Sequence, residues 1–200
     1  MRKDIIIVSG LPRSGTSMLM RMLEAGGIPP FTDVKRQADS DNPRGYYEYE
    51  PVKRLDQDAS WMGDAAGHAL KVISSLLRYL PQEYAYAVIF INRSLEEVLA
   101  SQQAMLRRRV EQGELDGEAI EPERLRREHD LLLKNFTGHL RQTHQWLQEQ
   151  PNIKTLLVEH RETLHNPHQT AQAIDMFLDG SLDVKAMCTI VEQPLYRQRI

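Results

Sequence analysis

The chain has 200 residues, of which 41% are hydrophobic and 26% charged, the proportions of an average soluble protein. A formal net charge of −3 argues against a general binder of nucleic acid or of anionic membranes, and no stretch reaches the length of a membrane span. We expect one domain over residues 1–200, without a signal peptide because the first strand begins at about residue 4. Cys188 is the single cysteine, which excludes an internal disulfide and favours the cytoplasm.

The first motif is a glycine loop, residues 10–17 (GLPRSGTS), between an apolar run at 5–8 and a helical pattern at 18–23. A strand, a glycine loop and a helix N-terminus in this order offer backbone N–H groups and the positive end of a helix dipole to a phosphate. The nucleotide P-loop has the pattern G-x-x-x-x-G-K-[ST]. Here Thr16 stands where the lysine should be, and the positive charge comes three residues earlier, at Arg13. Without that lysine the loop is poorly equipped to transfer a γ-phosphoryl group.

A second short strand is expected at residues 69–73, after a first helix that ends at Gly26-Gly27. Residues 28–50, rich in prolines and charges, are predicted to form a long loop over the site. The strand carries Lys71 among apolar neighbours, and a buried ammonium needs water, a carboxylate or an anionic ligand. Two placements stay open for this lysine: beside a bound anion, or on an edge strand with its side chain in solvent.

A third strand, residues 87–91, is followed directly by an arginine and a helix. Ser94 and Glu97 have the spacing of a capping box, which predicts that the helix begins directly after Arg93. An arginine at the carboxyl end of a strand lies where ligands bind in open α/β sheets. Ser101 lies two turns beyond Ser94 on the same helix face, so Arg93 and Ser101 are predicted to hold one phosphate together.

Strands and helices continue to alternate in the second half of the chain. The expected elements are a charged break at 113–121, a long helix over 122–150, a fourth strand at 155–158, and helices at 168–178 and 183–191. Residues 111–150 thus form an insertion and a long helix. The alternation predicts an α/β fold, a P-loop-type three-layer sandwich in which helices flank a four- or five-stranded parallel sheet.

Two of these segments resemble the donor-binding motifs of P-loop sulfotransferases. Residues 10–17 are similar to that family's 5′-phosphosulfate-binding loop, P-[KR]-S-G-T-[ST]. The segment 86–101 resembles its 3′-phosphate motif, in which a strand-terminal arginine is followed eight residues later by a serine. The tail is similar to that of short bacterial members. The resemblance implies transfer of a sulfuryl group from 3′-phosphoadenosine-5′-phosphosulfate (PAPS) to a hydroxyl or amine acceptor, without a metal. The product of the donor is adenosine 3′,5′-bisphosphate (PAP).

The resemblance also implies a role for individual residues. Those expected to bind the donor are Arg13, Ser14, Gly15, Thr16, Ser17, Arg93, Ser101 and His160. The first five hold the phosphosulfate, and Arg93 with Ser101 holds the 3′-phosphate. His160 stands where the family usually has a tyrosine near the adenine, in the segment V-x-Y-E-D-L-x-x-x-P. Lys71 matches the family's second-strand lysine. Arg13, Glu48 and Lys71 are the residues expected to take part in catalysis.

The general base must come from elsewhere in the chain, because the family's histidine base in a K-T-H run is absent and Ser74-Ser75 occupy that stretch. Residues 42–50 resemble the N-P-x-G-[FY]-[FYW]-E segment of many bacterial members. A carboxylate among aromatic rings can gain basicity by desolvation, so Glu48 is the expected base. Its alternative role is an ion pair with Arg44 that holds the loop. Glu50 and His68 are the other candidates.

The family's closing motif R-K-G-x-x-G-D-W-K is missing at the C-terminus. Arg197 and Arg199 either fold back to the nucleotide or belong to a solvated tail. Two other functions stay open: a small-molecule P-loop kinase using ATP and magnesium, which needs a lysine from elsewhere, and a non-catalytic nucleotide-binding module. The loop at 28–50 and the insertion at 111–130 fit acceptors from small metabolites to lipids, sugars and peptides.

Overall fold

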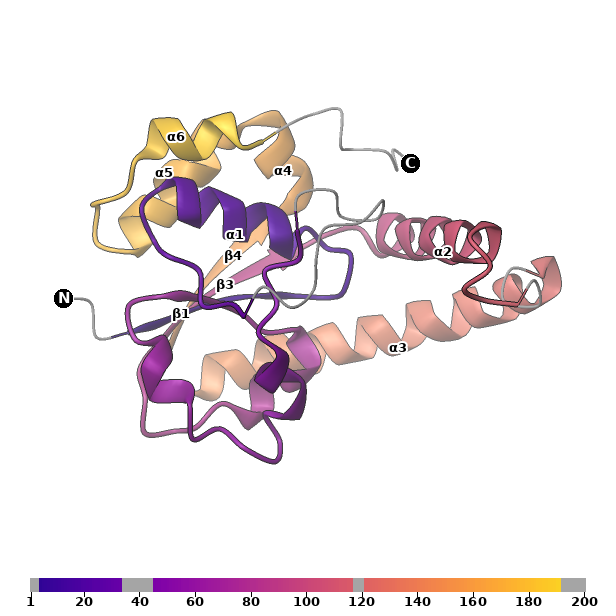
Figure 1. Ribbon diagram of the computed structural model, residues 1–200, viewed down its shortest axis with the longest axis horizontal. Helices are drawn as coiled ribbons and strands as arrows, with labels where there is room; N and C mark the ends of the chain where they lie inside the picture. The colour runs from indigo at the N-terminus through magenta and orange to yellow at the C-terminus, as the bar shows by residue number, and fades with distance from the viewer. Residues whose placement is uncertain (1–3, 34–44, 117–120, 192–200) are drawn as a thin grey trace.

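The computed structural model describes residues 4–33, 45–116 and 121–191. Its strands are β1 (Ile5–Gly10), β2 (Ala69–Lys71), β3 (Tyr86–Asn92) and β4 (Ile153–Glu159). They form a four-stranded sheet in the order β2-β1-β3-β4, in which every neighbouring pair is parallel. The predicted α/β fold with a parallel sheet is therefore confirmed (Figure 1).

Helices cover both faces of the sheet (Figure 1). The helices are α1 (Thr16–Ala25), α2 (Leu95–Glu111), α3 (Pro122–Glu149), α4 (His160–His165), α5 (Pro167–Phe177) and α6 (Val184–Thr189), with short 3₁₀ helices η1 (Glu50–Arg54), η2 (Met62–Ala65) and η3 (Ser74–Tyr79). One face packs against α1, α5 and α6, and the other against α3 and the 3₁₀ helices. Helix α4, which the sequence patterns did not predict, begins directly after β4.

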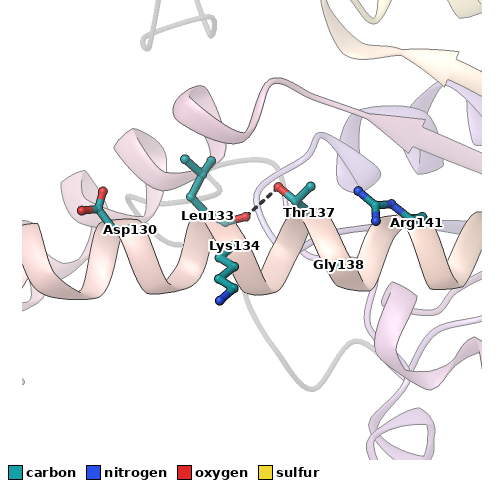
Figure 2. A pocket seen from close by; sticks show the side chains of 6 residues that line it. All are labelled: Asp130, Leu133, Lys134, Thr137, Gly138 and Arg141. Atoms are coloured by element: carbon teal, nitrogen blue, oxygen red, sulfur yellow. Dashed lines mark hydrogen bonds between the residues drawn. The ribbon is translucent and has the colours of Figure 1, made fainter.

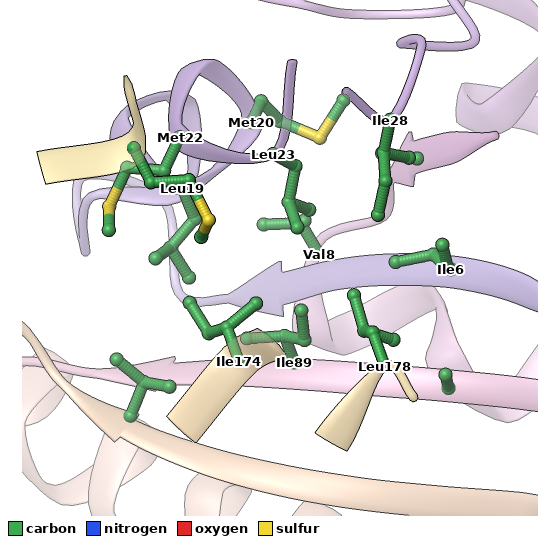
Figure 3. Close-up of a cluster of buried hydrophobic side chains, with 14 of the residues drawn as sticks. Ile6, Val8, Leu19, Met20, Met22, Leu23, Ile28, Ile89, Ile174 and Leu178 are labelled. Atoms are coloured by element: carbon green, nitrogen blue, oxygen red, sulfur yellow. The ribbon is translucent and has the colours of Figure 1, made fainter. Parts of the chain in front are cut away.

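The alternation of side chains along β1 divides the core into two clusters. Ile6 and Val8 belong to the cluster with α1, whereas Ile5 and Ile7 belong to the cluster with α3. Figure 3 shows the first cluster, with Val8 among side chains of α1 and α5. Because β1 is buried on both faces, its apolar run is continuous rather than alternating, as in other parallel sheets.

Helices α2 and α3 pack against each other and extend well beyond the sheet (Figure 1). The 28 residues of α3 match the long helix expected over 122–150, and they give it a length of about 42 Å. In the part of the chain that the structure describes, no helix combines the length and the apolar character that a membrane crossing requires.

The carboxyl ends of all the strands meet at one edge of the sheet, because the strands are parallel. This edge brings together the glycine loop after β1, Lys71 at the end of β2, Arg93 after β3 and His160 after β4. Several predictions fall outside the described residues. These are the middle of the 28–50 loop, the pairing of Arg44 with Glu48, and the roles of Arg197 and Arg199.

Candidate functional site

The glycine loop makes its tight connection between β1 and α1 through two glycines. A Cβ atom added to Gly10 would lie 2.5 Å from the Ser14 Oγ and 2.7 Å from the Ile91 carbonyl oxygen. Gly15 has a φ of 108°, and a Cβ there would lie 2.7 Å from the His160 ring. Only glycine fits such close approaches, and at Gly15 only glycine adopts the backbone without strain. The loop therefore presents backbone at the N-terminus of α1, as an anion site requires.

Ser14 lies buried inside the glycine loop. Its backbone N–H donates to the Leu11 carbonyl at 3.1 Å and so closes a turn inside the loop. Its side chain is 1% exposed, and the Oγ has no hydrogen-bond partner within the described parts of the chain. Contact of Ser14 with a bound anion stays a prediction.

Arg13 connects the glycine loop to the start of α2. Its backbone has a φ of 71°, in the left-handed region that residues other than glycine seldom adopt. The side-chain Nε donates to the Ser101 Oγ at 3.1 Å, and the Arg13 carbonyl accepts from the Arg93 Nη1 at 3.0 Å. Arg13, predicted to bind the phosphosulfate, is therefore hydrogen-bonded to Arg93 and to Ser101, the two residues predicted to bind the 3′-phosphate.

Arg93 forms an ion pair with Glu97 one helical turn later, with 2.9 Å between Nε and the carboxylate. The two side chains are only 9% and 6% exposed. This pair overturns the predicted capping box, because the Glu97 carboxylate binds the Arg93 guanidinium and α2 has no side-chain cap. The Ser94 hydroxyl donates instead to Glu96. A charge-assisted bond to a guanidinium is stronger than a cap to a neutral amide, which accounts for the outcome.

Lys71 lies beside the glycine loop, which excludes the solvent-facing placement. It pairs in register with Val8, so its side chain points toward α1, and it is 10% exposed. The ammonium donates to the Tyr46 carbonyl at 2.8 Å and to the Ser17 hydroxyl at 3.2 Å. The Glu48 carboxylate is close by, with 3.9 Å between its Oε1 and the Lys71 Nζ. The loop that carries Glu48 thus contacts the glycine loop through Lys71.

The structure separates the three candidates for the general base. Glu48 lies beside Lys71 and also 3.8 Å from the exposed Lys53. Glu50 is exposed and pairs with Lys53, away from the glycine loop. His68 precedes β2 at the amino edge of the sheet, opposite the edge where the other site residues gather. Glu48 alone among them combines a carboxylate with proximity to Lys71.

His160 lies beneath the glycine loop, with its ring against Gly15. The residue is 7% exposed, and burial lowers the pKa of its imidazole to about 4, helped by the Arg93 charge and opposed by Glu97. The ring is therefore neutral at pH 7 and supports the loop without adding charge. Contact of His160 with an adenine stays a prediction.

Sequence reasoning missed two participants. Glu97, interpreted as half of a capping box, could have been found from its spacing of four residues from Arg93, which is the spacing of ion pairs along a helical turn. The backbone carbonyl of Tyr46 as a partner of Lys71 has no sequence signal, because every residue has a carbonyl.

A separate open pocket of about 490 Å³ lies along α3 (Figure 2). Its lining residues are Asp130, Leu133, Lys134, Thr137, Gly138 and Arg141. None of them belongs to the predicted site, so this hollow and the glycine loop are different features of the surface.

No protein-family model matches the sequence, and no curated protein matches it. Solved structures do resemble the chain. A sulfotransferase from Alicyclobacillus acidocaldarius has 17% identity and a TM-score of 0.54, with 92% of this chain and 85% of that chain covered. The mouse sulfotransferase SULT7A1, solved in complex with PAP, has 18% identity and a TM-score of 0.57.

That second match covers 95% of this chain but only 63% of the mouse chain, so the protein spans less than two thirds of that relative. The sulfotransferase domain from the curacin biosynthetic pathway has 14% identity and a TM-score of 0.51, with 96% of this chain and 79% of that chain covered. At these identities the likeness concerns the arrangement of strands and helices. The chain has a sulfotransferase-like P-loop fold.

Proposed function

We propose that the protein transfers a sulfuryl group from PAPS to a hydroxyl or amine of an acceptor. The observation that carries the proposal is the network from Arg93 through the Arg13 carbonyl and side chain to Ser101. It joins the glycine loop to the residues that follow β3, at the edge where α/β sheets bind ligands. Two arginines and a hydroxyl at this edge suit a ligand that carries phosphates at both ends of an adenosine.

The groups at this edge fit such a donor chemically. Gly10 and Gly15 leave the backbone of the loop open to close approach, and the buried Ser14 hydroxyl has hydrogen-bonding capacity to offer. The protein as a whole has a net charge of −3, so the positive charge that an anionic donor needs must be local. Arg13 and Arg93 supply it. In the same fold, the mouse sulfotransferase was solved with PAP.

PAPS, when bound, supplies an activated sulfuryl group whose leaving group is the bisphosphate PAP. Arg13 stays protonated, so it stabilises negative charge at the loop and does not donate a proton. Lys71, held at the Ser17 hydroxyl, supplies a second cation at the N-terminus of α1. Arg93 and Ser101 hold the 3′-phosphate in this assignment. Preorganised cations of this kind stabilise charge that develops during transfer.

Glu48 is the residue that we assign to take the proton from the acceptor. Its carboxylate lies 3.9 Å from the Lys71 ammonium, so the proton acceptor and the stabilising cation are neighbours. A base beside the charge-stabilising group is the arrangement that an attacking hydroxyl needs. We place this activity in the cytoplasm, on the evidence of the single cysteine.

One observation favours the kinase as a second candidate. A kinase with this loop needs a lysine from outside the motif, and the Lys71 ammonium donates to the Ser17 hydroxyl within the loop. Lys71 is thus placed to contact a phosphate chain as the missing lysine would. The two candidates differ in the nucleotide and in the need for magnesium.

Calorimetric titration with PAP, ADP and ATP, each with and without magnesium, separates the candidates. We expect PAP to bind without metal, and Arg93→Ala to weaken that binding at least about thirtyfold, the effect of two or more charge-assisted bonds. Arg107→Ala, which removes an exposed arginine from α2, the helix that follows Arg93, is the matched control and should bind PAP as the unsubstituted protein does. Binding of ATP with magnesium, and none of PAP, would establish the kinase instead.

Turnover separates an enzyme from a binding module. The protein is incubated with PAPS and a panel of phenolic, sugar and amine acceptors, and release of PAP is followed. Acceptor-dependent release supports the transferase. Tight binding of PAP without release for any acceptor supports the non-catalytic module.

A further inference from the structure

Tyr47 adopts a backbone conformation that is unfavourable for a bulky residue. Its φ is 52°, and in the described residues only Arg13 and Asp179 share a positive φ without being glycine. The left-handed region crowds the Cβ against the backbone, so an aromatic residue stays there only when its surroundings hold it. Such outliers gather at functional sites, and this one precedes Glu48 directly.

Helix α1 supplies the contacts that hold Tyr47. The phenol donates a hydrogen bond to Glu24 Oε2 at 2.5 Å, and the ring packs against the core cluster beneath α1. Burial and the neighbouring carboxylate raise the pKa of Tyr47 to about 12, so the phenol keeps its proton at neutral pH and remains a donor. The glycine loop leads directly into α1. Helix α1 therefore supports both the loop and Tyr47.

The residues on either side of Tyr47 face the candidate site. The Tyr46 carbonyl accepts from the Lys71 ammonium at 2.8 Å. The Glu48 carboxylate lies 3.9 Å from the same ammonium, and the Glu48 carbonyl accepts from the Thr32 hydroxyl at 2.6 Å. The chain thus turns at Tyr47, with one side chain anchored on α1 and two neighbours directed at Lys71.

We propose that Tyr47 is a positioning residue. Its bond to Glu24 holds the backbone of residues 45–49 in the conformation that places Glu48 and the Tyr46 carbonyl at Lys71. The inference rests on the proposed function, in which Lys71 and Glu48 act on the transferred group. Without the anchor, the left-handed residue relaxes toward an ordinary conformation, and Glu48 moves away from Lys71.

The test removes the hydrogen bond between Tyr47 and Glu24 by changing either the donor or the acceptor. Tyr47→Phe keeps the ring and deletes the donor, whereas Glu24→Ala deletes the acceptor and Glu24→Gln retains one. We expect the first two to lower kcat about tenfold, with KM for PAPS and the Kd for PAP unchanged, because a misplaced base affects the reaction more than donor binding. Glu24→Gln should restore kcat to near the original value, and the double variant Tyr47→Phe/Glu24→Ala should be no worse than either single one.

Tyr49→Phe is the matched control. It removes a hydroxyl from a ring of the same loop, but that ring packs with Phe31 and Trp61 and its backbone is extended. We expect kcat at the original value. A loss in Tyr49→Phe equal to that in Tyr47→Phe would overturn the specific role of Tyr47.

Hydrogen exchange provides a readout that does not require turnover. We expect the amides of residues 45–49 to exchange faster in Tyr47→Phe, whereas those of β1 and α1 keep their original rates. If the unsubstituted protein binds no PAP, the proposed function fails, and exchange alone decides whether Tyr47 holds the loop. Unchanged exchange in Tyr47→Phe overturns the proposal, as does faster exchange with kcat unchanged in an active enzyme.

Discussion

The Arg93 guanidinium donates to the backbone carbonyl of Arg13 at 3.0 Å, across a separation of 80 residues in sequence. This bond makes the arginine after β3 a structural support of the glycine loop as well as a candidate phosphate ligand. Arg13 needs that support, because its left-handed backbone is strained. The two sequence motifs are therefore joined by a direct hydrogen bond.

Loss of the Arg93 side chain should destabilise the protein. Arg93→Ala removes the guanidinium that pairs with the buried Glu97 carboxylate, and breaking such a buried pair from one side costs about 3 kcal/mol. Urea unfolding of the unliganded protein measures this. The double variant Arg93→Ala/Glu97→Ala should lose less than the sum of the single variants, since the two side chains interact directly. Additive losses would contradict the pairing.

Removal of the charge at Lys71 should affect catalysis more than donor binding. Lys71→Met keeps the length of the side chain, and we expect kcat to fall about 10²- to 10³-fold because a preorganised cation is lost. The Kd for PAP should change by less than about threefold. Lys53→Met removes a lysine that is also near Glu48 but 54% exposed, and it should leave kcat within about twofold. Equal losses from the two variants would show that Lys71 has no special role.

A side chain at Gly15 should disturb the loop and the residue beneath it. Gly15→Ala combines a φ of 108° with a contact of 2.7 Å to the His160 ring, so we expect a loss of about 2–3 kcal/mol in the free energy of unfolding. Gly27→Ala is the comparison, because its φ is 98° and a Cβ there meets nothing within 4 Å. It should cost about 1 kcal/mol. If the free energy of unfolding falls by similar amounts at both positions, the His160 ring moves aside for the added methyl group without measurable cost.

Replacement of Gly138 by alanine should stabilise the protein, in contrast to Gly15→Ala. It lies inside α3, and a Cβ there meets nothing within 4 Å. Gly138→Ala should therefore raise the free energy of unfolding by roughly 0.5–1 kcal/mol, because alanine loses less backbone entropy in a helix. Gly113→Ala, at a φ of 74° beyond the end of α2, should lower it. Urea unfolding of both variants checks the signs, and a destabilised Gly138→Ala would contradict the structure of α3.

Stability should fall as the solution becomes acidic from pH 6.5. The pKa of His160 is about 4 in the folded chain against 6.5 as a free side chain, so between these values the unfolded chain binds more protons. The contribution of neutral His160 to the free energy of unfolding is thus complete above pH 6.5 and is lost as the pH falls toward 4. The difference corresponds to about 3 kcal/mol. Burial lowers the pKa of His139 and His144 as well, which acts in the same direction.

Unfolding free energies at pH 7, 6 and 5 measure this slope. His160→Gln should flatten the slope. A slope as steep in His160→Gln as in the unsubstituted protein would assign the acid sensitivity to other groups, such as His139 and His144.

Features within one continuous segment were predicted well. The strand before the glycine loop, the helix after it, the extent of α3 and the helix that begins just after Arg93 all follow from local patterns of apolar, glycine and charged residues. The capping box failed although it too is local. The Glu97 carboxylate binds the Arg93 guanidinium instead, a stronger partner that the spacing of four residues also indicated.

By itself, the sequence determined the four strands, the helices other than α4, and that an arginine-bearing glycine loop precedes a helix, because those properties depend on neighbours a few residues apart. Only the tertiary structure decided that Lys71 points to the loop rather than to solvent, and that Arg13, Arg93 and Ser101 form one network. The physical reason is that strand order and register set which carboxyl ends adjoin and which face each side chain takes. Packing of the whole sheet against its helices fixes both.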